Sequence, residues 1–112
     1  MTYEYPPTGT VIYGSIVGGP FLQAKAKPRP LVCLNDFGFL VPLTSTGQDC
    51  TIWINDTRTN GLVKPSGVIH NQRALLMPGS DYRIAGRMST TEMAVINKAI
   101  SRFGYEATYD VH

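Results

Sequence analysis

The feature that most constrains the fold is a series of short β-branched and aromatic runs, each bounded by glycine, proline, asparagine or aspartate. Runs of this kind are typical of β-strands joined by tight turns. They predict strands at Thr10–Val17, Leu31–Leu34, Phe39–Leu43, Thr51–Ile54, Gly67–Gln72 and Tyr82–Arg87. The segment Asn35–Gly38 has hairpin-turn chemistry, and Pro42 predicts a strand end or a sheet edge at its position.

One segment near the end of the chain has a helical pattern instead. Ser89 and Glu92 have the spacing of a capping box, in which each side chain satisfies a backbone N–H at the start of a helix. Apolar residues then recur at helical spacing, at Met93, Ile96, Ile100 and Phe103. Gly104 predicts the end of the helix. This apolar stripe predicts a helix packed on the sheet.

These elements predict a mainly β fold: a small barrel of antiparallel strands with one C-terminal helix. The 112 residues, 43% of them apolar, are enough for one compact core, so we expect a single domain over residues 1–112. Residues 1–8 and 105–112 lie outside the predicted elements, and we expect them to be flexible tails.

Several classes of protein are not indicated. No apolar run approaches the roughly 18 residues of a membrane helix, and the first residues carry no secretion signal, which predicts a cytoplasmic protein. The isolated Cys33 and Cys50 have no metal-binding spacing, and Cys33 is expected in the core. No motif indicates a metal or another cofactor.

The basic residues are unevenly distributed. The chain has a net charge of +2, but the body from Thr8 to Gly104 carries ten basic and five acidic residues, a net charge of +5. The stretches Val11–Asn35 and Thr57–Ser80 contain no acidic residue. This pattern favours a polyanionic partner, and the alternative is a solvated basic face that aids solubility.

Within the first acid-free stretch, Pro28-Arg29-Pro30 follows Lys25 and Lys27 and leads into an apolar strand. The two prolines restrict the backbone on both sides of Arg29. A guanidinium held on a stiff backbone is suited to an anion such as a phosphate. The alternative is a stiff turn with a solvated arginine.

Metal-free RNA cleavage needs few groups. The ribose 2′-hydroxyl attacks the adjacent phosphorus while protons are transferred and a cation stabilises the phosphorane. Candidates for these roles are Arg29, Arg73, His70 and the hydroxyls of Thr44, Ser45 and Thr46. The structural alternatives are a polar strand residue for His70 and a hydrogen-bonded turn for the three hydroxyls.

The order of several short motifs resembles the MazF/PemK family of toxin endoribonucleases. The matching segments are Gly9–Tyr13, Pro28–Val32, Val41–Ser45, Gly61–Ser66, Asn71–Arg73 and Ile84–Ser89. The resemblance implies an SH3-like barrel, a homodimer, and a toxin-antitoxin module whose toxin cleaves single-stranded mRNA at specific sequences without a metal. It also implies a cognate antitoxin with an acidic tail.

Residue by residue, the resemblance implies that Arg29 stabilises the phosphate and that Thr44 positions it. It places Gln72 and Arg73 on the RNA-contacting floor of the site. We therefore expect Arg29, Thr44 and His70 to be catalytic, and we expect RNA contacts from Lys25, Lys27, Ser45, Thr46, Gln72 and Arg73.

The sequence also departs from the family pattern. The loop before Arg29 lacks the acidic residue that many members carry, and Asn71 stands where the family has aspartate. Proton transfer must then fall to His70, Arg73 or Arg29. Two other functions stay open: a non-catalytic or gyrase-directed protein similar to CcdB on the same fold, and an SH3-like module that binds acidic peptides.

Overall fold

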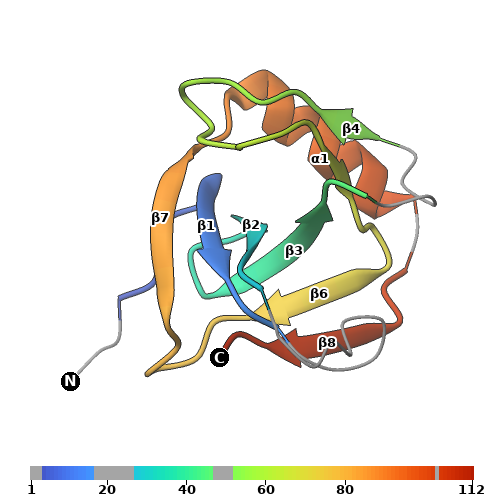
Figure 1. The fold of residues 1–112 in the computed structure, drawn as a ribbon. Helices are drawn as coiled ribbons and strands as arrows, with labels where there is room; N and C mark the ends of the chain where they lie inside the picture. Colours follow the sequence, from blue (N-terminus) through green and yellow to red (C-terminus); the bar gives the residue numbers. More distant parts are fainter. Residues whose placement is uncertain (1–3, 17–26, 47–51, 103) are drawn as a thin grey trace.

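The computed structural model describes residues 4–16, 27–46, 52–102 and 104–112. Over these residues the chain forms eight strands and one helix (Figure 1). Their bounds are β1 (Thr10–Gly14), β2 (Arg29–Cys33), β3 (Phe39–Thr44), β4 (Trp53–Ile54), β5 (Ser66–Val68), β6 (Gln72–Leu75), β7 (Tyr82–Arg87), α1 (Thr90–Ser101) and β8 (Ala107–Asp110). The predicted positions Val17, Lys25, Cys50, Thr51 and Phe103 lie outside the described residues.

The strands form one curved sheet. Its order is β4-β5-β3-β2-β1-β7, and β6 pairs with β3 and with β8. The pairs are antiparallel except for β6 and β8, which run parallel. Figure 1 shows the strands curling around a common centre, with α1 lying beside β4. The predicted fold class, a mainly β barrel-like sheet with a helix near the C-terminus, is confirmed.

The central strands β1, β2 and β3 are buried on both faces, because alternate side chains of a strand point to opposite sides. Val11, Val32 and Val41 belong to a core cluster that includes Ile96 of α1. Their sequence neighbours Ile12, Leu31 and Leu40 belong to a second cluster, together with Val111 near the C-terminus. The central strands are therefore the rigid frame on which the neighbouring loops are mounted.

The helix prediction is confirmed at its start. The Ser89 side chain accepts from the backbone N–H of Glu92, and the Glu92 side chain accepts from the backbone N–H of Ser89. Ile96 is completely buried, and Met93 and Ile100 pack against the first core cluster. This helix is too short and too polar to cross a membrane.

Three expectations about strands are corrected. The predicted strand Gly67–Gln72 is two strands, β5 and β6, with a turn at His70 and Asn71. Segment 105–112 was expected to be a tail, but β8 pairs with β6, and Val111 is only 3% exposed. A four-residue strand without a buried residue gives little periodic signal, so its pairing depends on the tertiary fold.

The third correction concerns Pro42, which lies inside the central strand β3 and is fully buried. On one side of β3, residues 39–40 pair with β6 and residues 43–44 pair with β5. Pro42 falls between these two partners, and its carbonyl accepts from Ile69 N at 3.0 Å. Since a residue's N and C=O point to the same side of a strand, the missing N–H of Pro42 falls at a gap in the ladder.

Cys33 is completely buried in the second core cluster, as expected from its apolar surroundings. Burial raises the pKa of its thiol to about 12, and the negative charge of Asp36 adds to the shift. A thiol with so little thiolate near neutral pH is unreactive. Cys33 is therefore a packing residue.

Candidate functional site

Strand register brings Arg29 and Thr44 to the same end of the sheet. Arg29 begins β2 and faces Gly14, the last residue of β1. The β2–β3 register pairs Leu31 with Pro42, and continuing it by two residues brings Arg29 opposite Thr44, the last residue of β3. Two segments 15 positions apart in sequence, joined by a tight hairpin, therefore end side by side.

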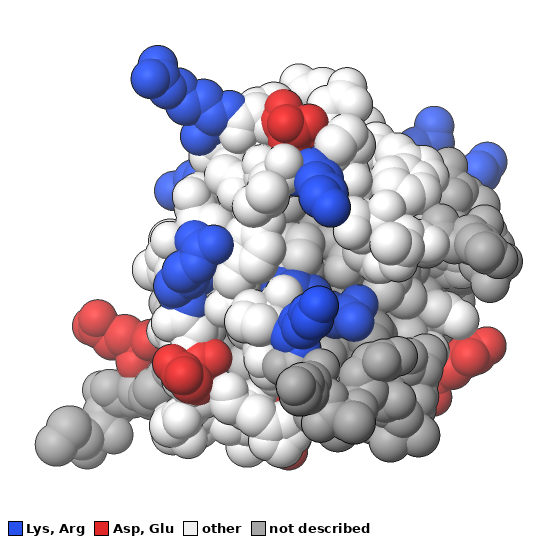
Figure 2. Space-filling model, in the orientation of Figure 1, with Lys and Arg blue, Asp and Glu red and all other residues white. Residues whose placement is uncertain are grey.

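A cleft of about 260 Å³ opens at this end of the sheet. It is lined by Tyr13, Lys27, Pro28, Arg29, Pro30, Leu43, Thr44, Ser45, Thr46, Val63, Lys64 and Ser66. Figure 2 shows Lys and Arg side chains gathered over the middle of the face seen in Figure 1. Among the described residues that line the cleft, three are cations and none is acidic. The cleft therefore has the charge to attract an anion.

Arg29 is the half-buried cation of this cleft. Burial removes water from the guanidinium and lowers its pKa. Arginine nevertheless stays protonated at physiological pH, so the protein holds a partly desolvated positive charge at the mouth of β2. An anion that enters the cleft offsets this desolvation cost, which makes Arg29 a favourable phosphate contact.

The three residues whose hydroxyls were predicted for the site, Thr44, Ser45 and Thr46, form the end of β3 and the bend after it. Thr46 N donates to Thr44 Oγ1 at 3.3 Å, and the hydroxyls of these two threonines lie 3.4 Å apart. Ser45 and Thr46 are exposed, whereas Thr44 is partly buried. These distances are long for hydroxyl hydrogen bonds, so both hydroxyl groups can reorient to donate to a ligand.

The cleft includes three polar residues that sequence reasoning did not select: Tyr13, Lys64 and Ser66. The Tyr13 hydroxyl accepts from Val63 N at 3.2 Å and ties β1 to the segment before β5. Ser66 Oγ donates to the Lys64 carbonyl at 3.0 Å and closes that segment into a turn. Lys64 could have been selected, because it lies in the acid-free stretch Thr57–Ser80 and in the segment Gly61–Ser66, which resembles the family. Tyr13 also ends a segment that resembles the family, but nothing in that segment indicated a cleft residue.

Three predicted site residues are not in the lining of this cleft. His70 lies in the turn between β5 and β6, and Gln72 and Arg73 begin β6. Gln72 is 6% exposed and Arg73 is 3% exposed. The structure therefore brings together Lys27, Arg29, Thr44, Ser45 and Thr46, and it places His70, Gln72 and Arg73 elsewhere. Lys25 lies outside the described residues.

Arg73 has contacts of a structural kind. Its Nη1 donates to the His70 carbonyl at 2.7 Å and to the Gln72 carbonyl at 2.8 Å. Its guanidinium carbon lies 5.0 Å from the Tyr105 ring centroid and 6.0 Å from that of Phe39. Burial lowers the pKa of Arg73, while Tyr105 opposes this shift. The guanidinium thus stabilises the β5–β6 turn from inside.

No described group of three or more His, Cys, Asp or Glu residues is placed to hold a metal ion. Within the described part of the chain, the cleft lining also contains no imidazole and no carboxylate. What the arrangement offers chemically is positive charge, hydroxyl donors and a phenol. Such a set suits binding and polarising a phosphodiester.

Comparisons with known proteins identify no relative. No protein-family model matches the sequence, and neither a curated protein nor a solved structure shows significant similarity to it.

Proposed function

We propose that this protein binds single-stranded RNA at the Arg29 cleft and cleaves it there without a metal ion, as the toxin of a toxin-antitoxin module. The observation that carries the proposal is the convergence of Lys27, Arg29, Thr44 and Lys64 on one cleft whose described lining holds no acid. A site of this charge favours a phosphate backbone. The resemblance to MazF/PemK toxins supplies the expectation of cleavage.

In this mechanism the ribose 2′-hydroxyl attacks the adjacent phosphorus, and the bond to the 5′-oxygen breaks. Arg29 stabilises the charge that develops on the non-bridging oxygens, and the Thr44 hydroxyl donates to one of them. Of the residues considered for proton transfer, Arg29 alone lines the cleft. We therefore assign proton transfer to water, which takes the 2′ proton and supplies one to the 5′-oxygen. The products are a 2′,3′-cyclic phosphate and a 5′-hydroxyl.

Digestion of single-stranded RNA with excess EDTA tests this proposal. We expect cleavage at a restricted set of sequences, at an unchanged rate, because no step uses a metal ion. Mass spectrometry of the fragments should identify 2′,3′-cyclic phosphate and 5′-hydroxyl ends. Fragments with 5′-phosphate ends, or cleavage abolished by EDTA, would contradict the mechanism.

The described lining, which has no imidazole or carboxylate, favours a second candidate, a binding protein on the same fold. General acid–base catalysis typically contributes about 10²–10⁴-fold to a rate, and its usual residues are missing from the described lining. A gyrase-directed protein similar to CcdB would need no such residues. Inhibition of DNA supercoiling by a protein that leaves every RNA intact would support this candidate.

The partners follow from the same charge. An antitoxin with an acidic tail would compete with RNA for Lys27, Arg29 and Lys64, since carboxylates and phosphates bind the same cations. The homodimer and the cytoplasmic location are further parts of the proposal, and they rest on the family resemblance and on the sequence composition. Size-exclusion chromatography with light scattering measures the oligomeric state directly.

The two lysines of the cleft should control the salt dependence of RNA binding. For single strands, the logarithm of the binding constant falls with the logarithm of salt concentration by about 0.7 for each phosphate contact. Lys27 and Lys64 are exposed and line the cleft. We therefore expect the double variant Lys27→Gln, Lys64→Gln to reduce the slope by about 1.4 in a fluorescence anisotropy titration.

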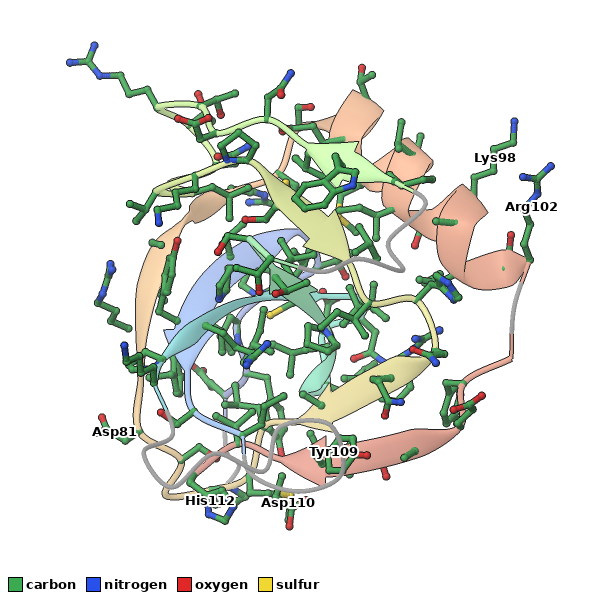
Figure 3. All side chains as sticks on the ribbon, turned by 45° about the vertical axis from the view of Figure 1, so that its right-hand side comes forward. Asp81, Lys98, Arg102, Tyr109, Asp110 and His112 are labelled. Atoms are coloured by element: carbon green, nitrogen blue, oxygen red, sulfur yellow. The ribbon has the colours of Figure 1, made fainter. Side chains whose placement is uncertain are left out.

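A matched control is available on the helix. Figure 3 shows Lys98 and Arg102 at the C-terminal end of α1, projecting away from the sheet. The double variant Lys98→Gln, Arg102→Gln removes the same charge and should leave the slope unchanged. Equal slopes for the two double variants would show that RNA binding depends on net charge and not on the cleft.

A further inference from the structure

A second cleft, of about 240 Å³, adjoins the first. Its lining residues are Tyr13, Gly14, Ser15, Pro28, Asp81, Tyr82, Arg83 and His112. Tyr13 and Pro28 also line the Arg29 cleft, so these two residues form a shared wall. Two adjoining clefts at one end of the sheet are an arrangement that two parts of one ligand can occupy.

The second cleft contains a cation that lies over the tyrosine of the shared wall. Tyr13 and Arg83 are paired across β1 and β7, and the Arg83 guanidinium carbon lies 4.6 Å from the Tyr13 ring centroid. The hydrogen bond from Val63 N to the Tyr13 hydroxyl fixes the ring. Arg83 itself is exposed. The guanidinium therefore lies over a tyrosine ring at cation–π distance, while the side chain stays accessible.

We propose that Arg83 is a stacking platform for the RNA base next to the phosphate bound by Arg29, an inference that rests on the proposed function. Proteins commonly hold unpaired RNA bases by stacking them on aromatic rings or guanidinium planes. The contact with the Tyr13 ring restrains the Arg83 guanidinium before RNA arrives. In the complex, the base lies on the side of the guanidinium away from the Tyr13 ring.

The strand register places Arg29 two strands away from the strand that carries Arg83. Arg29 is paired with Gly14, and Gly14 is paired with Tyr82, the residue before Arg83. Two strand spacings place the backbones of Arg29 and Tyr82 about 10 Å apart. Arg83 and Tyr13 occupy the alternate positions of these strands, so a ligand that reaches from Arg29 to Arg83 must also pass the shared wall of Tyr13 and Pro28 at the strand ends.

Charge distinguishes the two clefts. The first has no acidic residue in its described lining, whereas the second includes Asp81. Asp81 N donates to the His112 carbonyl at 3.1 Å, and His112 N donates to the Ser15 carbonyl at 2.9 Å, so this end of the sheet is tied together. Figure 3 shows Asp81 and His112 at this same end. A carboxylate repels a phosphate but accepts hydrogen bonds from a base, which favours a base in the second cleft.

The test separates stacking from charge. A pool of short RNAs, randomised at the positions flanking the cut, is digested by the parent protein and by the variants Arg83→Gln, Arg83→Lys and Lys98→Gln. Sequencing the fragments gives the base preference at each flanking position. We expect the parent and Lys98→Gln to share a preference at one position. Both Arg83 variants should weaken that preference about tenfold, since neither side chain offers a guanidinium plane.

Each outcome has a distinct meaning. If Arg83→Lys keeps the parent's preference, Arg83 acts as a charge and the stacking inference is wrong. If the parent cleaves RNA and both Arg83 variants keep its preference, the inference fails and the proposed function stands. If the parent cleaves no RNA in the pool, the proposed function fails and the inference fails with it.

Discussion

Replacing Arg29 with lysine is expected to slow RNA cleavage by about a hundredfold or more, with little change in RNA affinity. Removing one preorganised donor to a developing oxyanion typically costs about 10²–10³ in rate. Lysine keeps the charge but not the planar fork that contacts two oxygens of one phosphate. Because Arg29 is half-buried between Pro28 and Pro30, water cannot readily replace the lost donor. Single-turnover kinetics on a labelled RNA measure this effect.

The control for Arg29→Lys is Lys98→Gln, which changes an exposed cation on α1 outside the cleft lining. Thermal melting of both variants shows whether the fold is intact, which matters because Arg29 also begins β2. Arg29→Ala should be slower still and should bind RNA more weakly. If Arg29→Ala folds and cleaves as fast as the parent protein, the cleft is not the cleavage site.

The pKa of Arg29 determines whether this residue adds a titration step to the pH profile of the protein. Burial lowers this pKa, so the charged form is disfavoured in the folded protein relative to the unfolded chain. For a basic side chain whose pKa is lower in the folded protein, the charged form reduces the stability of the fold at every pH below that pKa. This cost is relieved only when the pH rises through the pKa. Arginine stays charged throughout the neutral range, so Arg29 contributes no titration step there.

The parts of the fold that depend on local chemistry could be predicted from the sequence. The Ser89 and Glu92 capping box defines the start of α1, and Tyr82–Arg87 has the predicted bounds of β7. Arg29, which the flanking prolines placed next to a predicted strand, is the first residue of β2. In each case, the sequence signal lies within a few neighbouring residues and agrees with the final fold.

The remaining features depend on contacts between distant segments. Pro42 is tolerated inside β3 only because β6 pairs with the residues before it and β5 pairs with the residues after it. The pairing of Tyr13 with Arg83 requires the β1–β7 register, which shifts between Val11 and Ile12. No periodic pattern in one segment specifies such a register. The sequence therefore indicated the first cleft through Arg29 but gave no sign of the second.

Arg73 is the residue for which the role implied by the family resemblance differs most from the observed contacts. The resemblance implies an RNA contact, whereas in the structure the Arg73 guanidinium donates to the carbonyls of His70 and Gln72. We expect Arg73→Met to lower the free energy of unfolding by about 2–3 kcal/mol, because two carbonyls lose a charged donor while the apolar stem is kept. For a domain of this size that corresponds to a decrease in Tm of roughly 10 °C.

Calorimetry and RNA cleavage, measured together, decide between the two roles of Arg73. Arg58→Met is the matched control, since Arg58 is an exposed arginine in the 57–60 turn and its loss should change stability by less than about 0.5 kcal/mol. With a structural role, Arg73→Met melts earlier but cleaves RNA at the parent rate at temperatures where it is folded. If it instead melts like the parent and no longer binds RNA, then β6 contacts RNA, and the binding surface extends beyond the Arg29 cleft.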